Sequence, residues 1–287
     1  MRSNFFVKSH GLGNEYIILD EASIDFPLTV KAIRRICNVH HGIGSDGILL
    51  RVPAIRADFA VRIFNPDGSE AEKSGNGLRI FCKYLYDYGY AGSRFTVETK
   101  GGIVTAEVCE LSGGKAHQIR VDMGRATFVS REVPTVFEEE EALGIDLEIA
   151  DRVFKVYCVS VGNPHCVVLQ DELDLNDILK YGSLLENHSS FPNRINVQFA
   201  RVISPREAEI LIWERGAGYT LASGSSSCGV ASVLRKLGLI EPSVTIRMPG
   251  GELQIELDDD FNIRMTGPVR QIAEGTLNPE LLADLEL

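Results

Sequence analysis

The stretch Trp-Glu-Arg-Gly-Ala-Gly-Tyr-Thr-Leu-Ala-Ser-Gly-Ser-Ser-Ser-Cys-Gly-Val, residues 213–230, has a counterpart 149 residues earlier in the chain, at 64–77. Phe64 takes the place of Trp213, and Ser74 takes the place of Ser223. Each of the two serines is followed by a glycine. One match of this kind can arise by chance, because glycine is common in turns.

The offset of 149 residues also holds on both sides of these stretches. Upstream, Gly-Asn at 13–14 corresponds to Gly-Asn at 162–163, and downstream Gly-Gly at 101–102 corresponds to Gly-Gly at 250–251. Several landmarks in one register indicate an internal duplication. The sequence therefore predicts two similar halves, and a cleft between such halves is a favoured place for a ligand.

Each Ser-Gly step is followed by the apolar spacing of a helix, at positions i, i+3, i+4 and i+7, which predicts one buried helix face. A serine at such a place is ordinarily an N-cap. A free helix N-terminus also offers unpaired N–H groups and a partial positive charge, which suit a carboxylate. The apolar residues are Leu78, Phe81, Cys82 and Leu85 in the first half and Val230, Val233, Leu234 and Leu237 in the second.

Other segments are predicted to be scaffold. Residues 58–64 alternate as a half-buried strand that ends at Asn65, and the alternation before Trp213 ends at Glu214 in the same way. Residues 27–37 and 174–188 have helical spacing, and residues 278–287 are a terminal acidic helix or tail. The charge run at 138–141 is expected to be a solvated connection.

Composition limits the function classes. With 44% hydrophobic and 24% charged residues among 287, the chain is typical of a globular protein with room for two domains. No stretch approaches the roughly 20 apolar residues of a membrane helix, and no leader peptide is recognisable, so a cytoplasmic location is expected. A net charge of -11 with scattered basic residues argues against a nucleic-acid partner.

Cysteine and histidine spacing indicates no metal site. The six cysteines form no C-x-x-C pair and are expected to be buried small apolar residues. His165, after the second Gly-Asn, is interpreted as a structural partner of its turn rather than as a general base, because no acidic partner lies at a useful spacing.

Seven segments together resemble the diaminopimelate epimerase family over essentially the whole chain. They are His-Gly-Leu-Gly-Asn at 10–14, Gly-Ile-Gly-Ser-Asp-Gly at 42–47, Phe-Asn-Pro-Asp-Gly-Ser-Glu-Ala-Glu at 64–72, Gly-Asn-Pro-His at 162–165, Arg-Ile-Asn-Val at 194–197, Trp-Glu-Arg-Gly-Ala-Gly at 213–218 and Pro-Gly-Gly at 249–251.

The resemblance implies an α+β fold of two pseudo-symmetric domains, each a sheet or barrel wrapped around a central helix, with the active site in the cleft between them. We expect residues 1–125 as the N-terminal half, with the tail 270–287 packed on it, and residues 126–269 as the C-terminal half. The implied activity is cofactor-independent conversion of LL- to meso-diaminopimelate, for lysine and peptidoglycan synthesis. A homodimer is also implied, with no metal and no cofactor.

The resemblance also implies roles for individual residues. Inversion without a cofactor requires two acid/base groups on opposite faces of the α-carbon. In the family both are cysteines, at the positions of Ser74 and Ser223. Asn65, Asn163, Asn196, Glu214 and Arg215 would hold the distal end of the substrate, and Asn14, Gly75, Asn76, Gly224 and Ser225 would surround its reacting end.

The two serines are the departure from the family pattern. A serine hydroxyl is a weaker acid than a thiol by roughly five units, so little or no epimerase activity is predicted. Either the serines are engineered, which the survival of six other cysteines favours, or the chain is a natural relative, which the unusual Ser226 and Ser227 favour. Alternative functions are a racemase for another amino acid and a diaminopimelate-binding protein without turnover.

Overall fold

Residues 3–286 are described by the computed structural model, and the chain divides into two units. Unit 1 consists of Met1–Val121 with Gly267–Leu287, and unit 2 of Asp122–Thr266. The chain leaves unit 1 within strand β8 (Lys115–Arg125) and returns to it within strand β17 (Asn262–Pro268). The mixed α+β class is confirmed by the elements of both units.

Unit 1 contains two parallel strand pairs, each connected through a helix. Strands β2 and β3 are parallel with α1 between them in the chain, and β4 and β6 are parallel with α2 between them. The other pairings in this unit are antiparallel. The elements are β1 (Phe5–Gly11), β2 (Asn14–Asp20), α1 (Val30–Cys37), β3 (Ile48–Val52), β4 (Phe59–Phe64), β5 (Glu70–Ala71), α2 (Gly75–Asp87), β6 (Arg94–Thr99), β7 (Gly102–Ser112), β8, β18 (Arg270–Thr276) and α5 (Pro279–Glu286).

Unit 2 repeats this order. Strands β11 and β12 are parallel with α3 between them, and β13 and β15 are parallel with α4 between them. The elements are β9 (Leu143–Ile149), β10 (Arg152–Ser160), β11 (Pro164–Leu169), α3 (Leu175–Glu186), β12 (Asn196–Ser204), β13 (Glu207–Glu214), β14 (Gly218–Thr220), α4 (Gly224–Lys236), β15 (Ser243–Met248), β16 (Gly251–Leu257) and β17.

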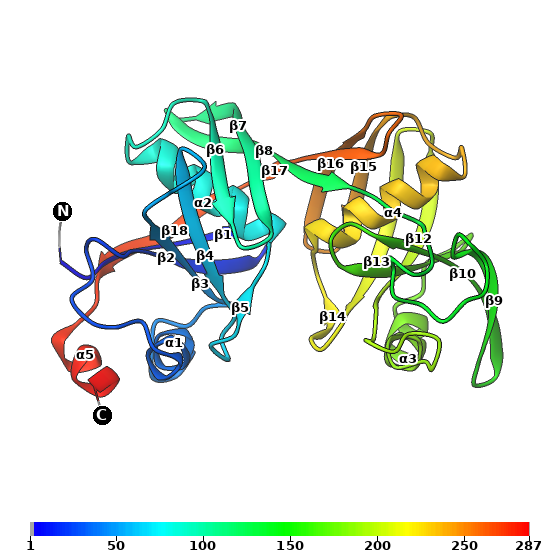
Figure 1. Ribbon diagram of the computed structural model, residues 1–287, viewed down its shortest axis with the longest axis horizontal. Helices are drawn as coiled ribbons and strands as arrows, with labels where there is room; N and C mark the ends of the chain where they lie inside the picture. Colours follow the sequence, from blue (N-terminus) through cyan, green and yellow to red (C-terminus); the bar gives the residue numbers. More distant parts are fainter. Residues whose placement is uncertain (1–2, 287) are drawn as a thin grey trace. The chain divides into compact units, whose positions relative to one another are not determined.

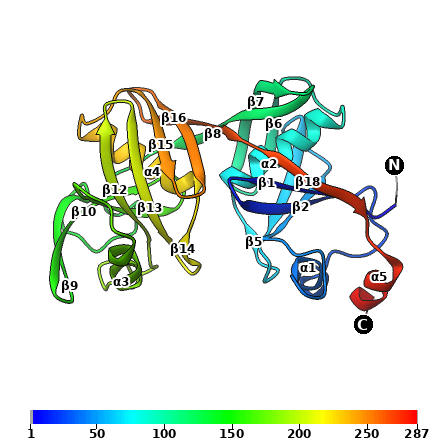
Figure 2. The same cartoon turned by 180° about the vertical axis from the view of Figure 1, so that it is seen from behind.

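The duplication is visible in the element bounds. Helices α2 and α4 begin and end at positions 149 residues apart, and so do strands β6 and β15. Strand β1 and its counterpart β10 each have an additional antiparallel neighbour, and the two neighbours come from different places in the chain. In unit 1 it is β18, which lies beside β1 (Figure 2), whereas in unit 2 it is β9, directly before β10.

Helices α2 and α4 are the centres of their units, and each is seen among the strands of its own unit in Figure 1. In α2, every residue of 75–85 is buried, and in α4 the same holds for 226–234. The sequence pattern predicted only one buried face. The prediction was too narrow because strands pack around these helices on several sides, so that even Arg79 and Lys83 of α2 are buried.

The smaller helices begin at polar caps. The Thr29 side chain accepts from the N–H of Ala32 at the start of α1, so this helix begins three residues later than the spacing predicted. Asp174 caps α3 in the same way, accepting from the N–H of Asn176. The acidic C-terminal segment forms α5, and Arg35 of α1 pairs with Asp284 there.

Among residues 3–286 the six cysteines form no disulfide, and five of the six are buried. Cys109 is exposed, so the expectation of burial was wrong for this residue. It lies in the second half of β7, where the strand runs on beyond the buried part of its sheet and its residues become exposed. Among residues 3–286, no helix is long and apolar enough to cross a membrane.

Candidate active site

Ser74 is the N-cap of α2. Its backbone is extended, with φ -140° and ψ 119°, and its hydroxyl oxygen accepts a hydrogen bond from the backbone N–H of Gly77 at 3.1 Å. Gly75 and Asn76, the first two residues of the helix, are buried. The capping role expected of this serine is therefore confirmed. The cap also places the Ser74 hydroxyl at the positive end of the helix dipole, where an anionic group is stabilised.

Two asparagines are locked beside this helix start. The guanidinium of the fully buried Arg79 donates to Asn76 Oδ1 at 2.8 Å, and a guanidinium can only donate. Asn76 therefore turns its amide Nδ2 to Asn14, whose Oδ1 accepts at 3.2 Å. The Nδ2 of Asn14 in turn donates to Asp46 at 2.9 Å. Both amides thus have a single orientation, set by charged groups at the two ends of the chain of hydrogen bonds.

Ser223 caps α4 in the same conformation, with φ -149° and ψ 125°. Its hydroxyl accepts from the N–H of Ser226 at 3.4 Å, and its side chain is buried. Its own N–H donates to the thioether of Met248 at 3.4 Å, and its carbonyl accepts from the Ser227 hydroxyl at 2.9 Å. Met248 and Ser227 thus fix the backbone of the cap.

Asn163 joins the turn before β11 to the start of α4. Its Nδ2 donates to the Ser225 hydroxyl at 3.4 Å, and its Oδ1 lies 3.0 Å from His165 Nε2. Because an amide oxygen only accepts, the Nε2 of His165 carries the proton. Burial lowers the pKa of His165 to about 3, so the ring is neutral near pH 7. The interpretation of His165 as a partner of its turn is confirmed.

Asn196 connects two further predicted residues. It is buried at the start of β12, donates to the carbonyl of Pro164 at 2.8 Å, and accepts from the backbone N–H of Arg215 at 3.0 Å. The exposed guanidinium of Arg215 donates to the carbonyl of Asn193 at 3.1 Å. Asn196 therefore holds the turn before β11 next to the segment that follows β13.

Glu186, which the sequence did not single out, anchors that segment after β13. Its side chain accepts from Trp213 Nε1 at 2.8 Å, from the N–H of Gly216 at 2.9 Å and from Arg194 at 3.0 Å. It holds the half-buried Glu214 between two anchored neighbours. Sequence gave no signal, because a glutamate at the last turn of a surface helix is expected to face water.

Asn65 occupies the turn between β4 and β5. Its N–H donates to the carbonyl of Ser69 at 2.8 Å, and its Nδ2 donates to the hydroxyl of the same residue at 2.9 Å. Its carbonyl accepts from the N–H of Gly68 at 2.9 Å. These bonds order the turn, so Asn65 is held by its own loop and by the strand that precedes it.

Hydrogen bonds and helix caps bring together ten of the predicted residues in two groups, one in each unit, whereas Asn65 is held within its own turn. In unit 1 these are Asn14, Ser74, Gly75 and Asn76, and in unit 2 they are Asn163, Asn196, Arg215, Ser223, Gly224 and Ser225. That the two groups meet across a cleft stays a prediction. Within residues 3–286, no group of three or more His, Cys, Asp and Glu side chains is arranged to hold a metal ion.

Comparison with known proteins identifies the family. The family model described as diaminopimelate epimerase matches residues 6–129 and 157–272. The chain belongs to the diaminopimelate epimerase family. "Diaminopimelate epimerase 2" of Nostoc sp. is 45% identical over 280 residues, covering 97% of both chains. "Diaminopimelate epimerase" of Desulfitobacterium hafniense is 39% identical over 283 residues, covering 96% of this chain and 99% of that one.

Solved structures show the same fold at low sequence identity. A probable proline racemase from Agrobacterium radiobacter superposes with a TM-score of 0.72 and 15% identity, covering 96% of this chain and 93% of that one. A likeness at this identity concerns the fold alone. Because the match covers 96% of this chain, the likeness in fold includes residues of both units.

Two native thiols lie on the central helices but away from the caps. Cys82 is inside α2 and fully buried, and burial raises the pKa of its thiol far above the usual range. Cys228 is inside α4 and also fully buried. Neither thiol therefore replaces the hydroxyl at the start of its helix.

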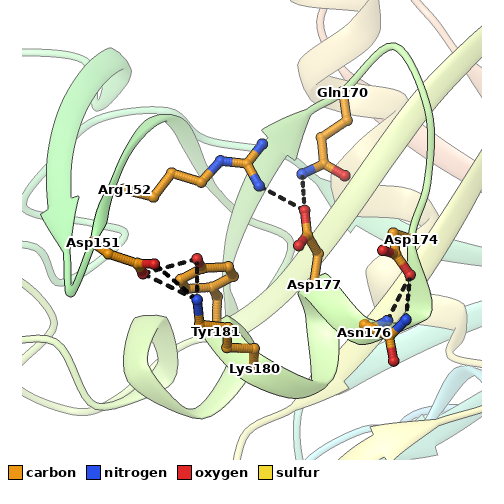
Figure 3. A network of polar contacts seen from close by, with 8 residues as sticks. All are labelled: Asp151, Arg152, Gln170, Asp174, Asn176, Asp177, Lys180 and Tyr181. Atoms are coloured by element: carbon orange, nitrogen blue, oxygen red, sulfur yellow. Dashed lines mark hydrogen bonds and ion pairs between the residues drawn. The ribbon is translucent and has the colours of Figure 1, made fainter.

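A groove of about 750 Å³ in unit 2 is lined by other residues than those predicted for the active site. In its wall, Asp177 accepts from Arg152 at 2.6 Å and lies 3.5 Å from the Gln170 amide nitrogen (Figure 3). Lys180 and Tyr181 on the same helix instead contact Asp151, at the turn between β9 and β10.

Unit 1 has a smaller hollow of about 320 Å³ at the matching place. Asp20 and Arg51 line it, 149 residues before Leu169 and Ala200, which line the groove of unit 2. The groove and the hollow therefore occupy equivalent places in the duplicated fold, and neither is lined by a residue that the sequence predicted for the active site.

Proposed function

We propose that this chain binds diaminopimelate and carries the scaffold for its cofactor-independent epimerisation from the LL to the meso form. With serine at positions 74 and 223, binding is retained and turnover is small or absent. The observation that carries the proposal is the pair of matching N-caps, Ser74 and Ser223, each at the start of a buried central helix. Relatives up to 45% identical bear the name diaminopimelate epimerase, which supports the same assignment.

The reaction requires one group to remove the α-proton and a second to return a proton on the opposite face. Two helix starts, one from each unit, supply two such positions if they face each other across the bound α-carbon. Their N–H groups and dipoles would stabilise the α-carboxylate and an anionic base. Gly75 with Asn76, and Gly224 with Ser225, are the first residues of the two helices and would hold that carboxylate.

The distal end of the substrate carries an ammonium and a carboxylate. Arg215 would bind the carboxylate, because a guanidinium gives a two-pronged contact. Glu214 would bind the ammonium, and the amides of Asn65, Asn163 and Asn196 supply neutral donors and acceptors. The rigid hydrogen bonds of Asn163 and Asn196 support this proposal, since a fixed amide loses little freedom when a ligand binds.

Serine makes both positions poor acids and bases. A deficit of roughly five pKa units relative to a thiol corresponds to about 7 kcal/mol, or about five orders of magnitude in rate. In the present chain, Ser74 Oγ accepts from the Gly77 N–H at 3.1 Å and lies 3.3 Å from the Tyr16 hydroxyl, and Ser223 Oγ accepts from the N–H of Ser226 at 3.4 Å.

The test is α-proton exchange with diaminopimelate in deuterated water. The chain as given is compared with the single variants Ser74→Cys and Ser223→Cys and with the double variant, after circular dichroism has verified the fold of each. We expect exchange at a substantial rate only in the double variant. A folded double variant without exchange would refute the proposed reaction, and a panel of other amino acids would then test the alternative of a different racemase.

The two serines also favour a second candidate, a diaminopimelate-binding protein without turnover. Calorimetric titration of the chain as given, with diaminopimelate and with lysine, separates the two candidates when it is combined with the exchange assay. Tight binding with a silent double variant would favour the binder. For both candidates we propose a cytoplasmic location and a homodimer. Sedimentation of the purified chain tests the homodimer.

A further inference from the structure

The tyrosine next to Ser74 is a feature that the duplication does not explain. Tyr16 lies on β2, two residues after Asn14, and its ring is buried, with only 6% of the residue exposed. Its hydroxyl oxygen is 3.3 Å from Ser74 Oγ. A titratable side chain therefore touches the hydroxyl at the start of α2.

The matching contact is different in unit 2. The position 149 residues after Tyr16 is His165, which bonds to Asn163 at 3.0 Å. The hydroxyl of Ser223 accepts from the backbone N–H of Ser226, as that of Ser74 accepts from Gly77, but among residues 3–286 no side chain is hydrogen-bonded to the Ser223 hydroxyl. The two helix starts are alike in backbone and capping but differ in the side chain that meets the capping atom.

The tyrosine ring is held in place by the loop before β3. A methyl group on Gly47 would come within 2.7 Å of the Tyr16 ring and 2.4 Å of the Phe64 carbonyl, so only glycine leaves room for the ring there. The Ser45 hydroxyl donates to the carbonyl of Gly47 at 2.7 Å, and the N–H of Ile17 donates to the same carbonyl at 3.1 Å. Close packing against this loop therefore fixes the position of the Tyr16 ring and, with it, that of the hydroxyl.

The direction of the hydrogen bond between Tyr16 and position 74 is fixed when the group at position 74 is an anionic base. The Gly77 N–H already donates to this atom, and an anionic base there has no proton to give. The Tyr16 hydroxyl must then be the donor. A hydrogen bond to the charged form of a group favours that form.

We propose that Tyr16 is a positioning residue for the acid/base group at position 74, and that its hydrogen bond makes this group the stronger acid of the two. The inference rests on the proposed function for its meaning in the reaction. With cysteine at both positions, the thiol at 74 then loses its proton at a lower pH than the thiol at 223. In the pH range between the two, position 74 is the base and position 223 the acid.

The other charged groups near this helix start are the same in a Tyr16→Phe variant and in its parent. Asp46 is bound to Asn14, and the buried Arg79 is bound to Asn76 and to the carbonyl of Gly75. Glu15 pairs with Lys8 at 3.0 Å. Lys73 directly precedes the capping residue. A Tyr16→Phe substitution leaves these groups and the ring in place and removes only the hydroxyl.

The test measures thiol reactivity and needs no substrate. In the Ser74→Cys variant, the rate of iodoacetamide alkylation at position 74 is followed against pH by peptide mass spectrometry, which separates it from the six native cysteines. Adding Tyr16→Phe should raise the pKa of that thiol by about one unit, because the charged form loses a donor. Tyr86→Phe, on the same helix far from its start, is the matched control and should change nothing.

The same substitution in the Ser223→Cys variant should leave the thiol at position 223 unaffected. An unchanged pKa at position 74, or an equal change at both positions, would overturn the inference. If Tyr16→Phe fails to fold, 3-fluorotyrosine at position 16 keeps ring and hydroxyl, and as a stronger donor it should lower the pKa at position 74. Absence of α-proton exchange in the double cysteine variant would refute the proposed reaction. It would not affect the thiol measurement, which tests the effect of Tyr16 without substrate.

Discussion

Asn163 donates a hydrogen bond to Ser225 at 3.4 Å, and the two residues are separated by 62 positions in the chain. Asn76 donates to Asn14 at 3.2 Å across the same separation in the other unit. In both units the asparagine of the Gly-Asn step between two antiparallel strands, β1 and β2 or β10 and β11, is thereby tied to the second residue of the central helix. The duplication has preserved this connection although the donor lies on the turn in one unit and on the helix in the other.

Removal of the Asn163 amide should weaken diaminopimelate binding. Asn163→Ala loses the bonds to Ser225 and His165 and leaves the buried Nε2–H of His165 without its acceptor. An unpaired buried donor lowers stability by about 1–3 kcal/mol, and the loss of one hydrogen bond to the substrate costs about 0.5–1.5 kcal/mol, so we expect affinity to fall by about two- to tenfold. Calorimetric titration measures it, with Asn187→Ala, at the C-cap of α3, as the matched control. Equal affinities in both variants would contradict the assignment.

Acid should destabilise the chain through His165. Its pKa is about 3 in the folded state because of burial, against about 6.5 in the unfolded chain. Between these values the unfolded chain binds a proton that the folded chain does not, so stability is complete above about pH 6.5 and is lost as pH falls. At pH 4 the loss from this residue is about 3 kcal/mol.

The measurement for His165 is urea unfolding at several pH values for the parent chain and His165→Gln. The variant is expected to be less stable at pH 7 and to show a shallower decline of stability from pH 6.5 to 4, because one proton no longer contributes. Parallel curves for the two proteins would mean that His165 is not buried in its neutral form. Carboxylates that titrate in this range affect both proteins equally.

Much of the fold follows from features that are local in sequence. The two central helices begin at the predicted serines because the capping oxygen, the first-turn glycine and the apolar spacing all lie within a few residues. Because of the duplication, helix α4 and strand β15 of unit 2 lie 149 residues after α2 and β6 of unit 1. Agreement between local signals is what makes such segments predictable.

Strands β9 and β18 had no such signal. The residues of β18 are almost all exposed, so no alternation of apolar side chains marks it, and it is a strand because its backbone pairs with β1. Within the candidate site, the contacts of Tyr16 with Ser74 and of Glu186 with Trp213 join residues far apart in the chain. Their partners are fixed by tertiary packing, which one sequence does not reveal.

The buried ion pair on α2 should be costly to break. Lys83 and Asp87 are 2.8 Å apart, with side chains only 7% and 1% exposed, and Asp87 also accepts from the N–H of Ala116 at 2.8 Å. Asp87→Ala leaves a buried ammonium without its counter-charge, which should lower the free energy of unfolding by about 3–5 kcal/mol.

Thermal unfolding by circular dichroism measures this loss. The matched control is Asp259→Ala, because Asp259 pairs with Arg235 at 3.3 Å while its side chain is 99% exposed. Exposed pairs contribute little, so the melting temperature of this control should stay that of the parent. Similar melting temperatures for the two variants would show that the Lys83 pair is open to water.

A methyl group at Gly182 should disturb the segment proposed to bind the distal end of the substrate. An added Cβ would lie 2.7 Å from the indole ring of Trp213, too close for either group to stay in place. Trp213 is also tied to Glu186 through its indole nitrogen, so displacement of the ring loosens the bonds that Glu186 makes to the following segment. Overpacking of this kind costs typically about 1–3 kcal/mol.

We therefore expect Gly182→Ala to lower both the melting temperature and the affinity for diaminopimelate. Gly92→Ala is the control, because a Cβ there meets nothing within 4 Å and its effect reports only the change in backbone freedom. Lysine lacks the distal carboxylate that Arg215 would bind, so its weaker binding should change less in Gly182→Ala than that of diaminopimelate. If Gly182→Ala lowers the melting temperature but leaves the affinity unchanged, the contacts of Glu186 do not contribute to substrate binding. The indole ring would then have moved without moving the residues after β13.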